Sequence, residues 1–225
     1  MKKEAITNAI MENYVAENSF LSIDGKKEYP QYLVSISDQH QNYCVGLVDM
    51  IGSTATATKL APVQVGSYYE IFLNSMSKVL GRFGGVIIKN IGDCLLFFFP
   101  ETRHENRKYG FMSTLECALA MKEEHDTIKQ KIKEERLPPM DYRISIDYGN
   151  VFVMKSNDSS IDLIGTPVNI CAKMNHLAPK NGVVIGGDCY ELVKKCKEYD
   201  FDALQGYSVL NDKSYPVYEL TRNER

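Results

Sequence analysis

Residues 86–99 read VIIKNIGDCLLFFF. Two apolar runs, 86–88 and 94–99, stand on either side of the polar residues 89–93. Short apolar runs joined by a few residues that include glycine are typical of an antiparallel hairpin with a tight turn. We therefore expect a hairpin here, with Lys89 and Asp93 at the ends of its strands.

Strands and helices alternate on both sides of this hairpin, as judged from apolar periodicity and turn residues. Residues 142–147 and 151–154 are expected to pair about a turn at Gly149 and Asn150. The other expected strands are 43–49, 183–185, one near Tyr207, and 216–220. The expected helices are 3–15, 65–83, 108–135, 167–177 and 188–195. This order predicts an α+β domain with a mostly antiparallel sheet covered by helices.

The folded domain is expected to span residues 43–225, because the pattern changes at Tyr43 from polar to apolar. Residues 1–42 are interpreted as an N-terminal helix and linker. That helix either packs locally or joins this chain to a sensor domain in a longer protein. Both alternatives stay open at this point.

Composition excludes several classes of protein. A chain of 225 residues with 44% hydrophobic side chains is long enough for one domain with a sizeable core. Its net charge of -3 and the lack of a basic stripe argue against nucleic acid as a partner. The longest apolar run is far too short to span a bilayer, and residues 1–4 lack a signal-peptide core, so we expect a cytoplasmic protein without a membrane segment.

Cysteine and histidine spacing predicts neither a zinc site nor a disulfide framework. The six cysteines contain no C-x-x-C pair, and none of the four histidines stands at metal-motif spacing from another ligand. We interpret the cysteines as buried thiols.

The chemistry centres on residues 48–54, VDMIGST, where an acid ends a strand and a small-residue loop leads into a helix. A carboxylate there can hold a hard divalent cation, and the loop N–H groups can cradle phosphate. Asp93 in the hairpin is a candidate second ligand. Two carboxylates that hold two ions about 4 Å apart clamp the entering and leaving oxygens in phosphoryl chemistry. No Gly-Lys-Ser/Thr follows, so this is not a Walker loop.

Three segments together resemble a known family. Asp49 with residues 51–53, then KNIGD at 89–93, then DLIGTPVNICAK at 162–173 are similar, in order and spacing, to the three signature segments of class III nucleotide cyclases. The resemblance covers about residues 43–220. It implies the ferredoxin-like fold of that family and a reaction in which ATP is closed into cyclic AMP with release of pyrophosphate.

The resemblance assigns roles by position. Asp49 and Asp93 become ligands of two divalent metal ions, Mg or Mn, and the backbone between Asp49 and Ile51 is given no role. Lys89 falls where ATP-using members place a lysine that donates to the adenine ring, and Asp162 where they place the acid that reads the exocyclic amine. The loop that receives the β and γ phosphates consists of Ile51, Gly52, Ser53 and Thr54.

The catalytic residues implied are Asn169, which orients the ribose, and Lys173, which contacts the phosphate in the transition state. The family usually has arginine in place of Lys173. A second basic phosphate contact of the family falls on Gln205, which Lys213 would have to replace.

Lys89 and Asp93 lie four positions apart, yet the resemblance places them at opposite ends of the nucleotide. This implies a homodimer in which each chain gives metal ligands to one site and base and ribose contacts to the other. Two alternatives remain open: a degenerate cyclase fold that binds nucleotide without turnover, and a cyclase for GTP or a pyrimidine nucleotide.

Overall fold

The computed structural model describes residues 20–21, 27–28, 34–105, 108–156, 161–204 and 215–223. The chain forms two compact units, Met1–Ser35 with Lys155–Ser160, and Ile36–Met154 with Ile161–Arg225. In the first unit β1 (Phe20–Leu21) pairs antiparallel with β2 (Lys27–Glu28). The helix expected over 3–15 lies outside the described residues.

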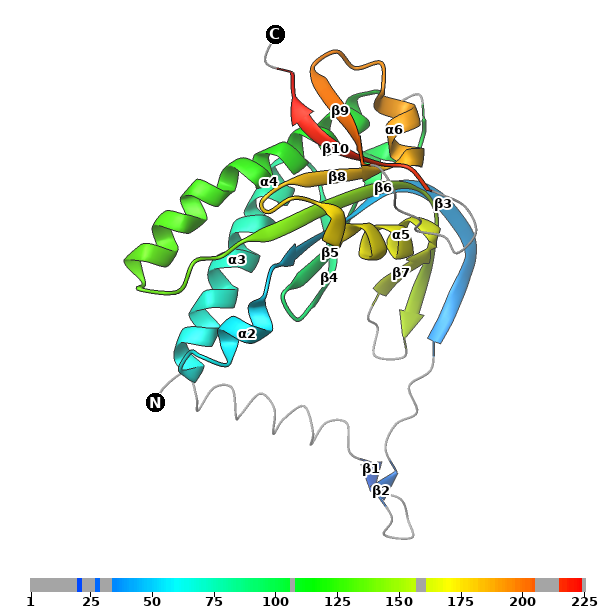
Figure 1. Cartoon of the computed structure of the whole chain (residues 1–225). Coiled ribbons are helices and arrows are strands. Elements are labelled where there is room, and N and C mark those ends of the chain that lie inside the picture. Colours follow the sequence, from blue (N-terminus) through cyan, green and yellow to red (C-terminus); the bar gives the residue numbers. More distant parts are fainter. Residues whose placement is uncertain are drawn as a thin grey trace. The chain divides into compact units, whose positions relative to one another are not determined.

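Eight strands of the described residues form one sheet in the order β4-β5-β3-β6-β8-β10-β9, and β7 pairs with β6 (Figure 1). Of the pairings resolved in detail, only β6 with β8 is parallel, and β3–β5, β4–β5, β8–β10 and β9–β10 are antiparallel. The α+β class with a mostly antiparallel sheet is thus confirmed. The strands are β3 (Val34–Met50), β4 (Val86–Ile91), β5 (Cys94–Phe99), β6 (Tyr142–Ser156), β7 (Ile161–Gly165), β8 (Val183–Gly186), β9 (Tyr199–Leu204) and β10 (Val217–Arg222).

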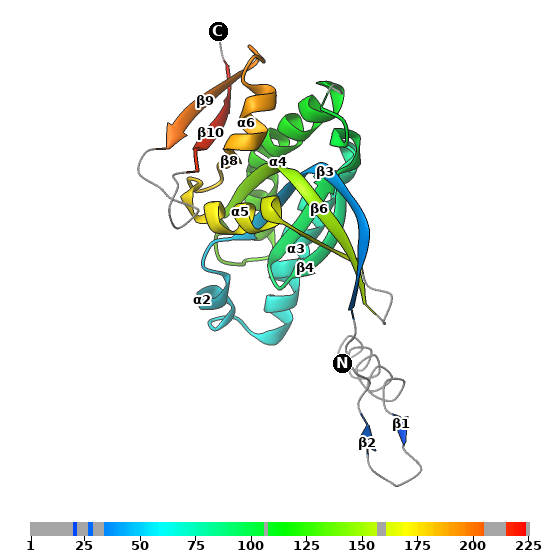
Figure 2. The same cartoon turned by 90° about the vertical axis from the view of Figure 1, so that its right-hand side faces the viewer.

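Helices cover both faces of the sheet. The long helices α3 and α4 lie on one face, and α5 lies on the other (Figures 1 and 2). No helix of the described residues is long and apolar enough to cross a membrane. The helices are α2 (Ser53–Ala57), α3 (Pro62–Arg82), α4 (Lys108–Glu134), α5 (Thr166–Met174) and α6 (Gly187–Val193), with short 3₁₀ turns at Pro100–Thr102 and Asn175–Leu177.

Strand β3 shows how the sequence builds these two layers. Successive side chains of a strand point to opposite faces, so Cys44 and Val48 enter the core under α3 and α4 while Val45 and Leu47 enter the core under α5. All four are buried, and burying a side chain of this size contributes about 2 kcal/mol. Because both faces are covered, the run is nearly all apolar, as the sequence indicated.

The hairpin expected at residues 86–99 is confirmed, with Ile91 opposite Cys94 in the antiparallel register of β4 and β5. Its turn is shorter than expected and consists of Gly92 and Asp93. Lys89 therefore lies inside β4 rather than at its end. An irregularity in the register falls between Ile87 and Lys89.

The strand pair expected about Gly149 and Asn150 is wrong, because β6 runs through both residues without a turn. Strand β7, which the sequence did not predict, pairs with β6 instead. Its last residue, Gly165, lies so close that a Cβ atom there would be 2.4 Å from the Asn150 carbonyl oxygen. A glycine is therefore required where β7 meets β6.

Three further expectations need adjustment. Strand β3 begins at Val34, within the segment expected to be an irregular linker. A strand was placed near Tyr207, which lies outside the described residues, and β9 ends before it at Leu204. All six cysteines are free thiols, but Cys94 and Cys196 are partly exposed rather than buried.

Candidate functional site

Two aspartates crowd together where β3 ends. Asp49 stands opposite Cys94 in the register of β3 and β5, and Asp93 directly precedes Cys94 in the hairpin turn. Burial and, next in size, the Asp93 charge raise the pKa of Asp49, while Arg143 acts in the opposite direction. The fold thus places two carboxylates of like charge side by side in a partly desolvated position.

This pair of carboxylates fits a divalent cation. Like charges at a half-buried site favour the protonated form, and a bound cation reverses that preference. Within the described residues no group of three or more His, Cys, Asp or Glu side chains forms a cage for a metal. Mg²⁺ is commonly held by one or two carboxylates together with substrate phosphates and water, which is the kind of donor set present here.

The loop after Asp49 is shaped by Gly52. Gly52 has φ +68°, a left-handed conformation that glycine adopts without strain, and it stands before the first turn of α2. Ser53 is buried at the start of that turn, where helix geometry leaves N–H groups without intrahelical acceptors. The Ile51 N–H is occupied, because it donates to the Asp141 carbonyl at 2.8 Å. Of the residues expected to receive phosphate, Ile51 to Thr54, Ile51 thus has its N–H engaged by the chain itself.

Lys89 and Asp162 meet, although 73 positions separate them in the sequence. The Lys89 ammonium forms an ion pair with Asp162 Oδ2, and the Asp162 Oδ1 atom accepts from the Leu163 N–H at 2.8 Å. Their side chains are 40% and 19% exposed, so the pair lies at the surface with its carboxylate mostly covered. It presents one hydrogen-bond donor beside one acceptor.

Helix α5 exposes Asn169 and Lys173 one turn apart. The opposite side of the helix is fixed to β6, because the Ser145 hydroxyl donates to the Cys171 carbonyl at 3.0 Å. The Asn175 amide, just past the helix, donates to the Arg143 carbonyl and to the Ser145 oxygen at 3.2 Å each. This anchoring holds both exposed side chains on a rigid base.

The expected metal ligand Asp49 and the expected base contact Lys89 share one face of the sheet. Leu96 of β5 stands opposite both Lys89 of β4 and Leu47 of β3, and Leu96 and Leu47 belong to the core under α5. Asp49 follows Leu47 by two residues and so points to that face. The expected site residues are therefore distributed over the face of the sheet that carries α5.

Sequence reasoning missed Arg143 and Asp141, which contribute to the surroundings of Asp49 and Ile51. The signal for Arg143 was present in residues 142–148, YRISIDY, where apolar residues alternate with the polar residues 143, 145 and 147. No comparable signal existed for Asp141, because its backbone carbonyl makes the contact. Gln205 and Lys213 lie outside the described residues.

Comparison with known proteins identifies the relatives of the chain. The family model for the adenylate and guanylate cyclase catalytic domain matches residues 36–221 of this chain. A cytidylate cyclase of Staphylococcus aureus is 26% identical over 67% of this chain and 37% of its own length. An adenylate cyclase of Streptomyces coelicolor is 23% identical over 63% of this chain and 31% of its own length. The chain thus spans about a third of the length of these curated relatives.

The fold has solved counterparts. The crystal structure of the adenylyl cyclase CyaB from P. aeruginosa superposes with a TM-score of 0.73, covering 87% of this chain and 98% of that one at 20% identity. A structure of the guanylyl cyclase Cya2 superposes with a TM-score of 0.70 at 18% identity. These likenesses show that the sheet and helices have the arrangement of class III cyclase domains.

Proposed function

Because the chain belongs to the adenylate and guanylate cyclase catalytic domain family, we propose that it converts a nucleoside triphosphate into a 3′,5′-cyclic monophosphate and pyrophosphate. ATP is the proposed substrate. The observation that carries the proposal is the Lys89–Asp162 ion pair on the sheet face to which Asp49 points, which supports a base-reading role for the pair and a metal-binding role for Asp49 with Asp93.

The ion pair favours adenine as the base that is bound. Adenine offers a ring nitrogen that accepts a hydrogen bond beside an exocyclic amine that donates one. Lys89 can donate to the first and Asp162 can accept from the second, so the base exchanges one ion pair for two hydrogen bonds. Guanine carries a ring N–H and a carbonyl in the equivalent places, which leaves both side chains mismatched.

CTP is the second candidate substrate, and two observations favour it. Cytosine presents the same order of groups as adenine, a ring nitrogen acceptor beside an amine, so Lys89 and Asp162 suit it equally. Two curated relatives, 26% and 25% identical, carry the name cytidylate cyclase. Uracil, like guanine, reverses donor and acceptor and is disfavoured by the same pair.

In the proposed reaction the ribose 3′-hydroxyl attacks the α-phosphorus and pyrophosphate leaves. Asp49 and Asp93 would hold divalent ions, which would neutralise the triphosphate charge and lower the pKa of the 3′-hydroxyl. Asn169 orients the ribose, and Lys173 offsets the negative charge that develops at the phosphate. Since both reacting groups belong to one molecule, positioning on the rigid α5 supplies much of the rate enhancement.

We further propose that two chains assemble to complete each site, because Lys89 and Asp93 lie four positions apart on one hairpin, whereas their proposed roles lie at opposite ends of the nucleotide. Exposed apolar side chains lie on the adjacent strands β3, β6 and β7, as a contact between copies requires. They are Ile36, Phe152, Ile161 and Ile164, which are 56%, 37%, 50% and 39% exposed. A head-to-tail arrangement would give each site metal ligands from one chain and base contacts from the other.

The test is an assay of ATP, CTP, GTP and UTP with Mg²⁺ or Mn²⁺, with products resolved by mass. We expect metal-dependent formation of cyclic AMP, or of cyclic CMP for the second candidate, together with one pyrophosphate per turnover. Binding of ATP and metal without pyrophosphate release would favour a regulatory module that has lost turnover. Fastest product formation from GTP or UTP would contradict the assignment of Lys89 and Asp162.

A further inference from the structure

A cavity of about 450 Å³ lies between the C-terminal part of α4 and the segment that leads into β6, away from the site described above. Its floor is apolar and consists of Ile132, Leu137 and Met140, each less than 9% exposed. Two lysines of α4, Lys129 and Lys133, stand at its rim. A volume of this size is typical of pockets that enclose small organic ligands.

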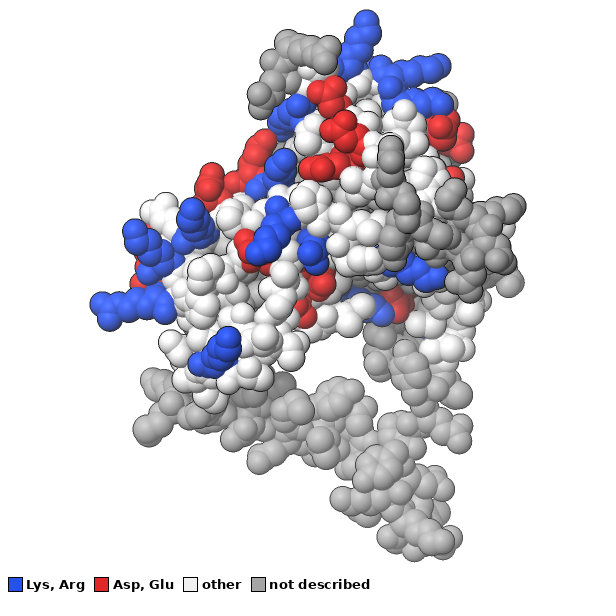
Figure 3. Space-filling view, viewed as in Figure 1, with Lys and Arg blue, Asp and Glu red and all other residues white. Residues whose placement is uncertain are grey.

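The rim carries unneutralised positive charge. Lys129 and Lys133 are exposed and one helical turn apart on the same side of α4, and within the described part of the chain neither forms an ion pair. The acid of the lining, Asp141, is already engaged by Lys180 at 3.2 Å and by the Asn181 amide at 2.8 Å. Figure 3 shows basic side chains gathered over this end of α4.

We propose that this cavity binds a small amphipathic anion. Its apolar body would lie on Ile132, Leu137 and Met140, and its carboxylate or phosphate would contact Lys129 and Lys133. Burial of the apolar body favours an amphipathic ligand over a fully polar one, and hydrogen bonds to the two lysine ammonium groups favour an anion over a neutral or cationic ligand.

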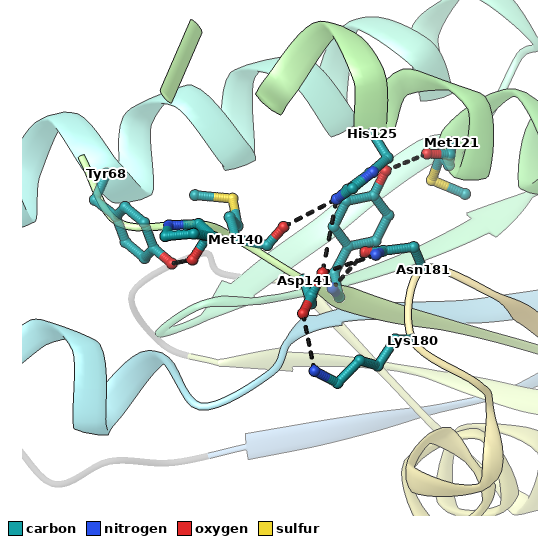
Figure 4. Close-up of polar contacts among 9 residues, drawn as sticks. Tyr68, Met121, His125, Met140, Asp141, Lys180 and Asn181 are labelled. Atoms are coloured by element: carbon teal, nitrogen blue, oxygen red, sulfur yellow. Dashed lines mark hydrogen bonds and ion pairs between the residues drawn. The ribbon is translucent and has the colours of Figure 1, made fainter. Parts of the chain in front are cut away.

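The wall of the cavity is connected by a backbone hydrogen bond to the loop that begins at Ile51. His125 Nε2 lies 3.2 Å from the Met140 carbonyl oxygen, and the Tyr68 hydroxyl donates to the Pro139 carbonyl at 3.0 Å. Figure 4 shows Tyr68, His125 and Met140 around the segment 139–141. The next carbonyl, that of Asp141, accepts from the Ile51 N–H at 2.8 Å.

A ligand that braces the segment 139–141 therefore acts on Ile51 through one backbone hydrogen bond. Such coupling requires only that the ligand favour one position of this segment over another. The binding of the anion is independent of the proposed cyclase activity, whereas its regulatory meaning rests on that activity.

The first experiment is calorimetric titration of the purified full chain with sodium octanoate, octanol and octylammonium. We expect octanoate to bind at a single site per chain and octanol to bind at least about tenfold more weakly, because octanol lacks the negative charge that pairs with the two lysines. Equal binding of octanoate and octanol, or no binding of octanoate, would overturn the proposal. Hexyl phosphate in a parallel titration distinguishes a phosphate head group from a carboxylate.

Charge reversal locates the site. In Lys129→Glu/Lys133→Glu we expect octanoate binding to fall at least tenfold and octylammonium binding to appear, because the rim changes sign. The matched control is Lys78→Glu/Lys197→Glu, which reverses two exposed lysines away from the cavity and should keep octanoate binding. Octanoate binding that survives in the first variant, or is lost in both, would contradict the assignment.

Coupling has its own measurement, which does not require turnover. In a ¹⁵N-isoleucine sample, with the Ile51 amide assigned by its disappearance in Ile51→Val, octanoate should shift the Ile51 signal in wild type and not in Lys129→Glu/Lys133→Glu. An Ile51 amide signal that does not shift while octanoate saturates the cavity would refute the coupling.

Discussion

Asp49 and Asp147 are both aspartates whose pKa burial raises, yet the protein surrounds them differently. Asp147 is 0% exposed in β6, and it accepts from the Tyr215 hydroxyl at 2.9 Å and from the Cys189 N–H at 3.4 Å. Asp49 is partly exposed and faces a second carboxylate, Asp93, instead of a hydroxyl donor. A raised pKa alone thus does not mark a catalytic residue.

The difference lies in what completes each carboxylate. Around Asp147 the chain supplies the hydrogen-bond donors itself, so the group stabilises the junction of β6, α6 and the start of β10. At Asp49 and Asp93 the chain brings two like charges together and opposes their effect only through Arg143, so we propose that a cation from outside the chain completes this site. We therefore expect substitution of Asp147 to change stability and substitution of Asp49 or Asp93 to change activity.

The largest expected effect is on turnover. Asp49→Asn or Asp93→Asn should lower the rate of cyclic nucleotide formation at least about a thousandfold, because several kcal/mol of charge stabilisation is lost. Metal-free Asp93→Asn should be no less stable to urea than wild type, since it removes a like charge beside Asp49. The control Asp126→Asn, an exposed acid of α4, should keep activity. Near wild-type rates in both site variants would contradict the assignment.

Asp147 is expected to affect the pH dependence of stability instead. Its pKa is about 7 in the folded chain and near 3.8 when unfolded. Its contribution is thus fully present below about pH 4 and lost as pH rises to about 7. Asp147→Asn cannot ionise, so its unfolding free energy relative to wild type should increase on the order of a few kcal/mol between pH 4.5 and 7.5.

Urea unfolding at three pH values in that range measures this difference, with Asp126→Asn as the reference for a surface carboxylate. A constant difference between Asp147→Asn and wild type across the range would show that Asp147 is ionised throughout.

A smaller effect is expected on base selection. Lys89→Glu/Asp162→Cys replaces the donor and the acceptor that are proposed to contact the base. We expect the ratio of kcat/KM for the preferred substrate, ATP or CTP, to kcat/KM for GTP to fall at least about tenfold. The matched control is Lys78→Glu, which should leave the ratio unchanged. An unaltered ratio in the double variant would mean that other groups read the base.

The last expected effect concerns Lys173, where the resemblance to class III cyclases implies an arginine. A lysine keeps the charge but lacks the planar fork of arginine, a difference of about 1–3 kcal/mol in the transition state. We expect Lys173→Arg to equal or exceed wild type by up to about a hundredfold, and Lys173→Ala to be slower than wild type. If wild type, Lys173→Arg and Lys173→Ala all formed no cyclic nucleotide, the site would have lost its catalytic activity.

Much of this arrangement could be predicted from sequence, because apolar periodicity determines which face a residue takes. The hairpin, the helices α3 to α6 and the position of Asp49 at a strand end follow from that rule. The rule failed at Gly149 and Asn150, because turn-forming residues also occur inside a strand where a neighbouring strand, here β7, packs closely against β6. The contact of Ile51 with the Asp141 carbonyl could not be predicted, because it involves backbone atoms and no particular side chain.

If one chain holds only part of each catalytic site, two inactive variants should restore activity when they are mixed. Asp93→Ala and Lys173→Ala each lack a group from a different part of the site. A mixed dimer would combine one fully defective site with one intact site. We expect partial recovery of cyclic nucleotide formation after mixing, with subunit exchange verified by sizing of differently tagged chains. No recovery despite complete exchange would contradict sites shared between two chains.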